Sequence, residues 1–142
     1  MLVKLLADQI SIYWPHIKTA LIETTPELTD RGLTVILENL LCDSMQCWFE
    51  LVGEGDDTRL LAVVVTSVFQ DNFFQSNILR ICCLYGFDNI SQEQWQEGFT
   101  ALRLYAQSKN CTRIEAFTLR EGLSVIAKKF GGTVDFHISL EV

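Results

Sequence analysis

Two segments near the start of the chain carry apolar residues at steps of three and four, the spacing of one face of an α-helix. The first predicted helix covers residues 2–22, with Pro15 inside it as a point of kinking or division. The second begins at Asp30, a residue type that caps helix N-termini, and continues to Leu41. The pattern therefore predicts two helices ahead of any strand.

After the second helix the pattern changes to that of β-strands. Three strands are predicted, at 47–54, 59–70 and 78–87. The second and third are apolar at nearly every position, which is typical of strands covered on both faces of a sheet. Turn-rich loops, "GEGDDT" and "DNFFQSN", join the three strands as successive hairpins.

The rest of the chain alternates between helices and strands. Ser91 and Gln94 have the spacing of a capping box and begin a third predicted helix. A strand at 113–120, a short helix ended by two glycines and a strand at 133–142 follow. We expect one domain, 1–142, of the α/β (α+β) class. Its mixed, mostly antiparallel central sheet has five to six strands, with helices on both faces.

Charge and composition exclude several functional classes. The net charge is -7, and the 11 Lys and Arg form no basic patch, so nucleic acid is not an expected partner. No apolar run is long enough for a membrane span, and no secretory signal opens the chain. The 5 cysteines form no C-x-x-C pair, which argues against a zinc site and favours a reducing compartment.

The segment 120–132, "REGLSVIAKKFGG", resembles the N-x-x-A-x-x-L-Y-x-K-x-G-F pattern of the GNAT acetyltransferases. Ile126, Lys129 and Gly131 match its aliphatic, lysine and glycine positions, while Leu123 replaces its small residue. The predicted order of elements resembles the GNAT fold over nearly the whole chain. The resemblance implies a GNAT-like scaffold in which this segment packs a helix against the sheet.

Departures from the family pattern fall on positions that carry its chemistry. The tyrosine that protonates the departing coenzyme A thiolate in many members falls on Ala127, which cannot donate a proton. The family's asparagine falls on Arg120 and its phenylalanine on Gly132. The resemblance therefore implies the fold without the usual general acid.

The bend before the third predicted helix is where the family binds the diphosphate of acetyl-CoA, through Q/R-x-x-G-x-G/A. Here it reads "YGFDNISQEQW", with Gly86 as its one glycine. Asp88 and Glu93 would repel a diphosphate, and the Ser91 side chain would satisfy an N–H group that a phosphate needs. We therefore interpret the bend as a degenerate cofactor site.

These departures favour a non-catalytic structural or protein-interaction protein without cofactor, of the kind found among tailed-phage genes and their virion modules. It would bind a protein partner or a copy of itself, in the cytoplasm or in a virion. The candidate contact residues are Phe73 and Phe74 in the loop "DNFFQSN", together with Trp48, and the first helix is an alternative contact surface. Folding of the same loop over an edge of the core is the alternative for these aromatics.

The alternative function is an acetyl-CoA-dependent N-acyltransferase with a divergent diphosphate loop. Glu50 or His137 would be its base and Tyr85 its acid. A purely structural role is the alternative for each of these three residues, because none has a catalytic partner nearby in the sequence. Main-chain groups need no particular side chain to pair with the pantetheine arm, and the predicted cofactor-binding residues are Cys83, Leu84, Tyr85 and Gly86.

Overall fold

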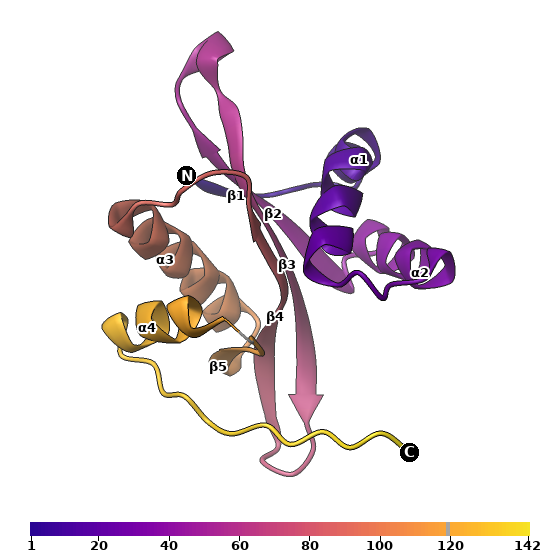
Figure 1. The fold of residues 1–142 in the computed structure, drawn as a ribbon, viewed down its shortest axis with the longest axis vertical. Coiled ribbons are helices and arrows are strands. Elements are labelled where there is room, and N and C mark those ends of the chain that lie inside the picture. The colour runs from indigo at the N-terminus through magenta and orange to yellow at the C-terminus, as the bar shows by residue number, and fades with distance from the viewer. Residues whose placement is uncertain (119) are drawn as a thin grey trace.

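The computed structural model describes residues 1–118 and 120–142 and contains a mixed sheet with helices on both faces (Figure 1). Within these residues the strand order is β1-β2-β3-β4-β5. The strands are β1 (Leu2–Lys4), β2 (Met45–Val52), β3 (Arg59–Asp71), β4 (Ser76–Gly86) and β5 (Cys111–Ala116). β1 to β4 pair antiparallel in sequence order, and β5 joins β4 in parallel.

Two helices cover one face of the sheet and a third covers the other (Figure 1). The helices are α1 (Ala7–Thr24), α2 (Asp30–Leu41), α3 (Gln92–Ser108) and α4 (Glu121–Lys129), with a 3-10 turn η1 (Gly55–Asp57) after β2. The core between the sheet and α1–α2 contains Phe49, Val63 and Cys83, whereas the core under α3 contains Trp48, Val64 and Leu79. Neighbouring strand residues thus enter opposite cores, which is why β3 has no polar face.

The predicted fold class is confirmed, including the mostly antiparallel sheet and the helices on both of its faces. The first helix was placed too early, because Leu2–Lys4 form strand β1 and α1 begins at Ala7. It then runs without division through Pro15. The sequence pattern predicted a helix at Leu2–Lys4 because the apolar residues there continue the helical spacing of the residues that follow.

The end of the chain differs from the prediction. The strand expected at 113–120 is observed as β5 at Cys111–Ala116, and its position 119 lies outside the described residues. No strand forms at 133–142, within the part of the chain that the structure describes. The stop of α4 is confirmed: Gly131 has φ +79°, and Gly132 N–H donates to the Ala127 carbonyl at 2.9 Å.

No described helix combines the length and the apolarity needed to cross a membrane.

Candidate active site

β4 changes its neighbours halfway along its length. Val65 of β3 faces Cys83, but the next residue, Thr66, faces Ile81, so Cys82 is an extra residue in a β-bulge. The pairing of β4 with β5 ends at Ile81 and Ala116. Among the described residues, β4 therefore has a neighbouring strand from Cys82 to Gly86 on the β3 side only, and its other edge is open there.

The main-chain groups on this open edge follow from the hydrogen-bond register. The Phe87 N–H group donates to the Leu61 carbonyl at 2.8 Å, so Phe87 faces β3. Main-chain groups alternate between the two sides of a strand, which turns those of Tyr85 and Cys83 toward β3 as well. The N–H and C=O groups of Leu84 and Gly86 consequently point to the open edge.

A buried chain of polar side chains fixes β2 to β3 beside the bulge. The Trp48 indole N–H donates to Thr66 Oγ1 at 2.9 Å, and that hydroxyl donates to Gln46 Oε1 at 3.0 Å. Thr66 is fully buried, and the other two side chains are at most 5% exposed. Sequence inspection missed this chain, because its three residues lie on two strands whose register is not visible in the sequence.

The α1–α2 side of the open edge carries a thiol and a phenol. Cys83 Sγ lies 3.3 Å from Thr24 Oγ1 at the end of α1, and burial raises the pKa of the Cys83 thiol. Tyr85 is half-buried, and its ring packs edge-on against Phe87 with centroids 5.0 Å apart. Tyr85 thus places a phenol on β4 between Leu84 and Gly86, whose main-chain groups face the open edge.

The bend between β4 and α3 is self-capped, as the sequence indicated. Ser91 Oγ accepts from the Gln94 N–H group at 3.2 Å, and Gln94 Oε1 accepts from the Ser91 N–H group at 2.8 Å. Asp88 does stand at the bend, but Arg59 Nη1 lies 3.3 Å from its carboxylate. This ion pair is not visible in the sequence, since the two residues are 29 positions apart.

Glu50 lies on the opposite face of the sheet, beneath α3. Its side chain is 5% exposed and borders a cavity of about 40 Å³ whose other lining includes Leu84, Trp95 and Phe99. Oε1 accepts from the Met1 amine at 2.6 Å, whereas Oε2 has no partner among the described residues. A base in this position faces the α3 side, whereas Tyr85 faces α1 and α2.

His137 does not lie on a strand. It is exposed, and its ring centroid is 4.8 Å from that of Phe117, just after β5. The structure therefore does not bring the three predicted catalytic residues into one cluster. Within residues 1–118 and 120–142, no group of three His, Cys, Asp or Glu side chains is placed to hold a metal ion.

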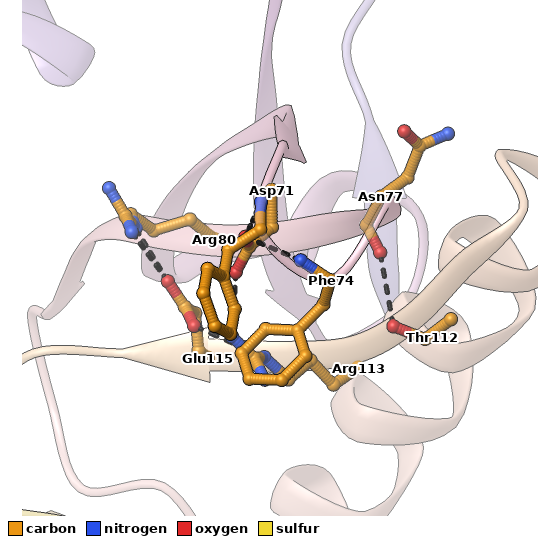
Figure 2. A network of polar contacts seen from close by, with 8 residues as sticks. Asp71, Phe74, Asn77, Arg80, Thr112, Arg113 and Glu115 are labelled. Carbon is orange, nitrogen blue, oxygen red and sulfur yellow. Dashed lines mark hydrogen bonds and ion pairs between the residues drawn. The ribbon is translucent and has the colours of Figure 1, made fainter.

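The hairpin between β3 and β4 presents the two predicted contact phenylalanines. Phe73 and Phe74 are 87% and 65% exposed, and Asp71 Oδ1 accepts from both of their N–H groups. Figure 2 shows the network behind them, in which Arg113 lies between Asp71 and Glu115. Contact with a partner stays a prediction for these two residues.

Trp48 cannot belong to an exposed contact surface. It is 5% exposed, and its ring packs edge-on against Tyr105 at 5.0 Å. The prediction grouped Trp48 with Phe73 and Phe74 because nothing in the neighbouring sequence shows which face of the sheet a tryptophan near the start of a strand will occupy.

No protein-family model matches the chain, and no curated protein matches it in sequence. Solved structures match over its full length. A probable acetyltransferase superposes with a TM-score of 0.77 at 13% identity, covering 100% of this chain and 97% of the other. The aminoglycoside N-acetyltransferase AAC(6')-Iy in complex with CoA has a TM-score of 0.73 at 11% identity, with 100% and 93% covered.

A third match is a predicted acetyltransferase with acetyl-CoA from Clostridium acetobutylicum. Its TM-score is 0.71 at 18% identity, and 100% of this chain and 94% of the other are covered. Identities this low establish a common fold.

These neighbours correct three predictions. The expected non-catalytic structural protein is contradicted, because the three neighbours are named as acetyltransferases. The expectation of no cofactor is contradicted by the CoA and acetyl-CoA in two of them. The pseudoenzyme, phage and virion assignments are wrong for the same reason, since enzymes and no virion protein stand among these matches. The chain has the fold of the GNAT acetyltransferases.

Proposed function

We propose that the protein is an acetyl-CoA-dependent N-acyltransferase whose diphosphate loop diverges from the GNAT pattern. The observation that carries this proposal is the open edge of β4, where the strand continues beyond its pairing with β5. The acetyltransferases of the same fold, two of them with CoA or acetyl-CoA bound, add support.

The residues present fit the amide-bearing part of the cofactor. The pantetheine arm carries amide donors and acceptors, and Leu84 and Gly86 offer main-chain groups of both kinds at the open edge. An extended ligand adds to such an edge as a further strand would. This fit does not depend on side-chain identity, so it tolerates the sequence divergence at the bend.

The residues at the bend before α3 fit the diphosphate of the cofactor less closely. The Gln94 N–H group is already engaged by Ser91, and Glu93 is acidic in the first turn of α3. Arg59 offsets the charge of Asp88 and is 67% exposed at its side chain. We propose that Arg59, rather than a glycine loop, supplies the positive charge for the diphosphate.

Tyr85 is the candidate acid for the departing thiolate, and bound acetyl-CoA would supply the acyl group. An acceptor amine would approach from the α1–α2 side, where Tyr85 and Cys83 face. The net charge of -7 favours cationic amines as acceptors over anionic ones. The same proposal places the protein in the cytoplasm, where acetyl-CoA is available and free thiols remain reduced.

Thermal denaturation with acetyl-CoA tests the binding step. Ligand at a hundred times its dissociation constant stabilises by about 2.7 kcal/mol, which raises the Tm of a chain this long by about 9 °C. Leu84→Pro removes one open-edge N–H group while leaving the bonds to β3, and it should abolish the shift. Leu84→Ala keeps that N–H group and should retain the shift.

Two outcomes would contradict the proposal. One is the absence of any shift in the wild-type protein at millimolar acetyl-CoA. The other is an undiminished shift in Leu84→Pro, which would put the ligand elsewhere. Turnover should be followed by chromatography of CoA with a panel of primary amines, because the exposed Cys42 and Cys82 react with thiol reagents.

A further inference from the structure

One buried carboxylate oxygen beneath α3 lacks a partner. The side chain of Glu50, on β2, is 5% exposed, and its Oε1 atom accepts from the Met1 amine at 2.6 Å. Its Oε2 atom is buried and has no hydrogen-bond partner among the described residues. Buried polar groups in proteins nearly always have a partner, because leaving one unpaired destabilises the fold. Glu50 Oε2 is therefore an acceptor that a donor from outside the chain can complete.

Glu50 borders a cavity of about 40 Å³, called here the Glu50 cavity. The cavity extends from Leu84 on β4 across Val64 on β3 to Leu2 on β1, and residues of α3 close it on the other side. This direction leads away from the open edge of β4, because β3, β2 and β1 follow one another on the opposite side of that strand. The Glu50 cavity also lies on the face of the sheet opposite to Tyr85. It is thus separate from the site proposed for the cofactor arm.

The walls of the Glu50 cavity are mostly apolar. Trp95 and Phe99 of α3 line it, and their rings stack with centroids 6.0 Å apart. Gln94 also lines it, but Gln94 Oε1 already accepts from the Ser91 N–H group. A buried water needs two to four polar partners, which these walls do not offer beside Glu50 Oε2. The walls instead suit a ligand that has one donor group and an apolar remainder.

The charges around Glu50 favour a cationic donor. The Met1 amine lies 2.6 Å from Glu50 Oε1 and 3.9 Å from Glu97 Oε2, so two carboxylates share one positive group. A second ammonium group at Glu50 Oε2 would balance them through a charge-assisted hydrogen bond. Aromatic rings such as those of Trp95 and Phe99 also attract a nearby cation. A metal ion is not indicated, since within residues 1–118 and 120–142 no group of three His, Cys, Asp or Glu side chains is placed to hold one.

We propose that the Glu50 cavity binds a short primary alkylammonium ion. Its ammonium group donates to Glu50 Oε2, and its carbon chain packs against Trp95 and Phe99. A group the size of a water molecule needs about 10–15 Å³ of such space, so the cavity admits about three non-hydrogen atoms, the size of ethylammonium. At the highest efficiency of small ligands, three such atoms give a dissociation constant of about 1 mM. The site is independent of the acyltransferase function.

Thermal denaturation of the full chain with ethylammonium chloride tests this site. At about 20 mM, which is about twenty times the expected dissociation constant, the Tm should rise by about 6 °C relative to equal sodium chloride. Ethanol has the same size without the charge, and tetraethylammonium has the charge without an N–H donor. Neither control should raise the Tm by a comparable amount.

Two variants distinguish the Glu50 cavity from other amine sites, including an acceptor site near Tyr85. Glu50→Gln keeps the shape of the side chain and removes its charge, so ethylammonium should bind about tenfold more weakly or less tightly still. Gly98 lines the cavity from α3, and a Cβ atom there meets no atom within 4 Å. Gly98→Ala should therefore fold, because alanine favours a helix over glycine, and its methyl group should weaken binding about tenfold by occupying part of the cavity.

Gly122→Ala is the matched control for the second variant. Gly122 lies in α4, and a Cβ atom there also meets no atom within 4 Å, so the same change should leave ethylammonium binding intact. Isothermal titration calorimetry gives the dissociation constant for each protein. The absence of a Tm rise in the wild type, an equal rise with ethanol, or binding that is unchanged in either Glu50→Gln or Gly98→Ala would overturn the proposal.

Discussion

Replacing Thr66 by valine is expected to destabilise the protein strongly, because the change removes a hydroxyl and preserves the shape of the side chain. Thr66 is fully buried and holds the Trp48 indole N–H and the Gln46 side-chain oxygen. In Thr66→Val both groups lose this partner while remaining buried. Thr66 also borders the register shift that creates the open edge of β4, so the same residue links stability to the proposed site.

The magnitude follows from the two orphaned groups. A buried polar group without its partner costs about 1–3 kcal/mol, and the added methyl group returns about 0.8 kcal/mol. The free energy of unfolding should therefore fall by about 1–5 kcal/mol. A chain of 142 residues has an unfolding entropy of about 0.3 kcal/mol per kelvin, so the Tm should fall by about 4–17 °C.

Scanning calorimetry and urea unfolding measure both quantities. Thr66→Ser is the matched control, because it keeps the hydroxyl and loses one methyl group, at a cost of about 1 kcal/mol. Combining Thr66→Val with Trp48→Phe removes a donor together with its acceptor, so the double variant should lose less than the sum of the two single changes. A Thr66→Val protein as stable as Thr66→Ser would refute the reasoning.

Three further predictions concern the cap of α3 and two titratable groups. Ser91→Ala should lower the free energy of unfolding by about 0.5–2 kcal/mol in urea titrations, since it removes the side-chain cap, and an unchanged midpoint would contradict this. Burial raises the pKa of Tyr105 to about 12 from 10.0, so its proton stabilises the fold fully below pH 10 and this contribution disappears as the pH rises through 12. Tyr105→Phe should flatten that part of the stability–pH curve. Hydrogen bonds from Ser44 lower the pKa of the exposed Cys42 thiol, whereas burial raises the pKa of the Cys47 thiol to about 12. After treatment with iodoacetamide, mass spectrometry should therefore find Cys42 modified first and Cys47 modified only after unfolding.

Local patterns in the sequence predicted those elements whose cause is local. The cap of α3 needs only Ser91 and Gln94, and the stop of α4 needs only Gly131 and Gly132. The uniformly apolar β3 predicted a sheet covered on both faces, because burial on both faces is what such a strand requires. These features depend on residues within one or two helical turns of each other.

Features that depend on register between distant strands were not accessible from the sequence. The bulge at Cys82 exists because β3 and β4 pair in one particular alignment, and nothing within β4 marks it. The ion pair of Arg59 with Asp88 joins the start of β3 to the bend before α3. The strand expected at 133–142 has the correct alternation, but alternation does not decide whether a segment pairs with an available edge, and no strand forms there among the described residues.

The loss of the glycine loop led to the expectation of a protein without cofactor, and the reason this inference failed is physical. The inference considered only the side chains at the bend, where Asp88 and Ser91 do oppose the binding of a diphosphate. An extended cofactor arm, however, pairs with main-chain groups, and those of Leu84 and Gly86 are exposed by the end of β5 whatever the side chains are. Arg59 further offsets the Asp88 charge, so repulsion at the bend is weaker than the sequence suggests. Under the proposed function, the geometry of the sheet provides a site for the cofactor arm although the glycine-loop signature has changed.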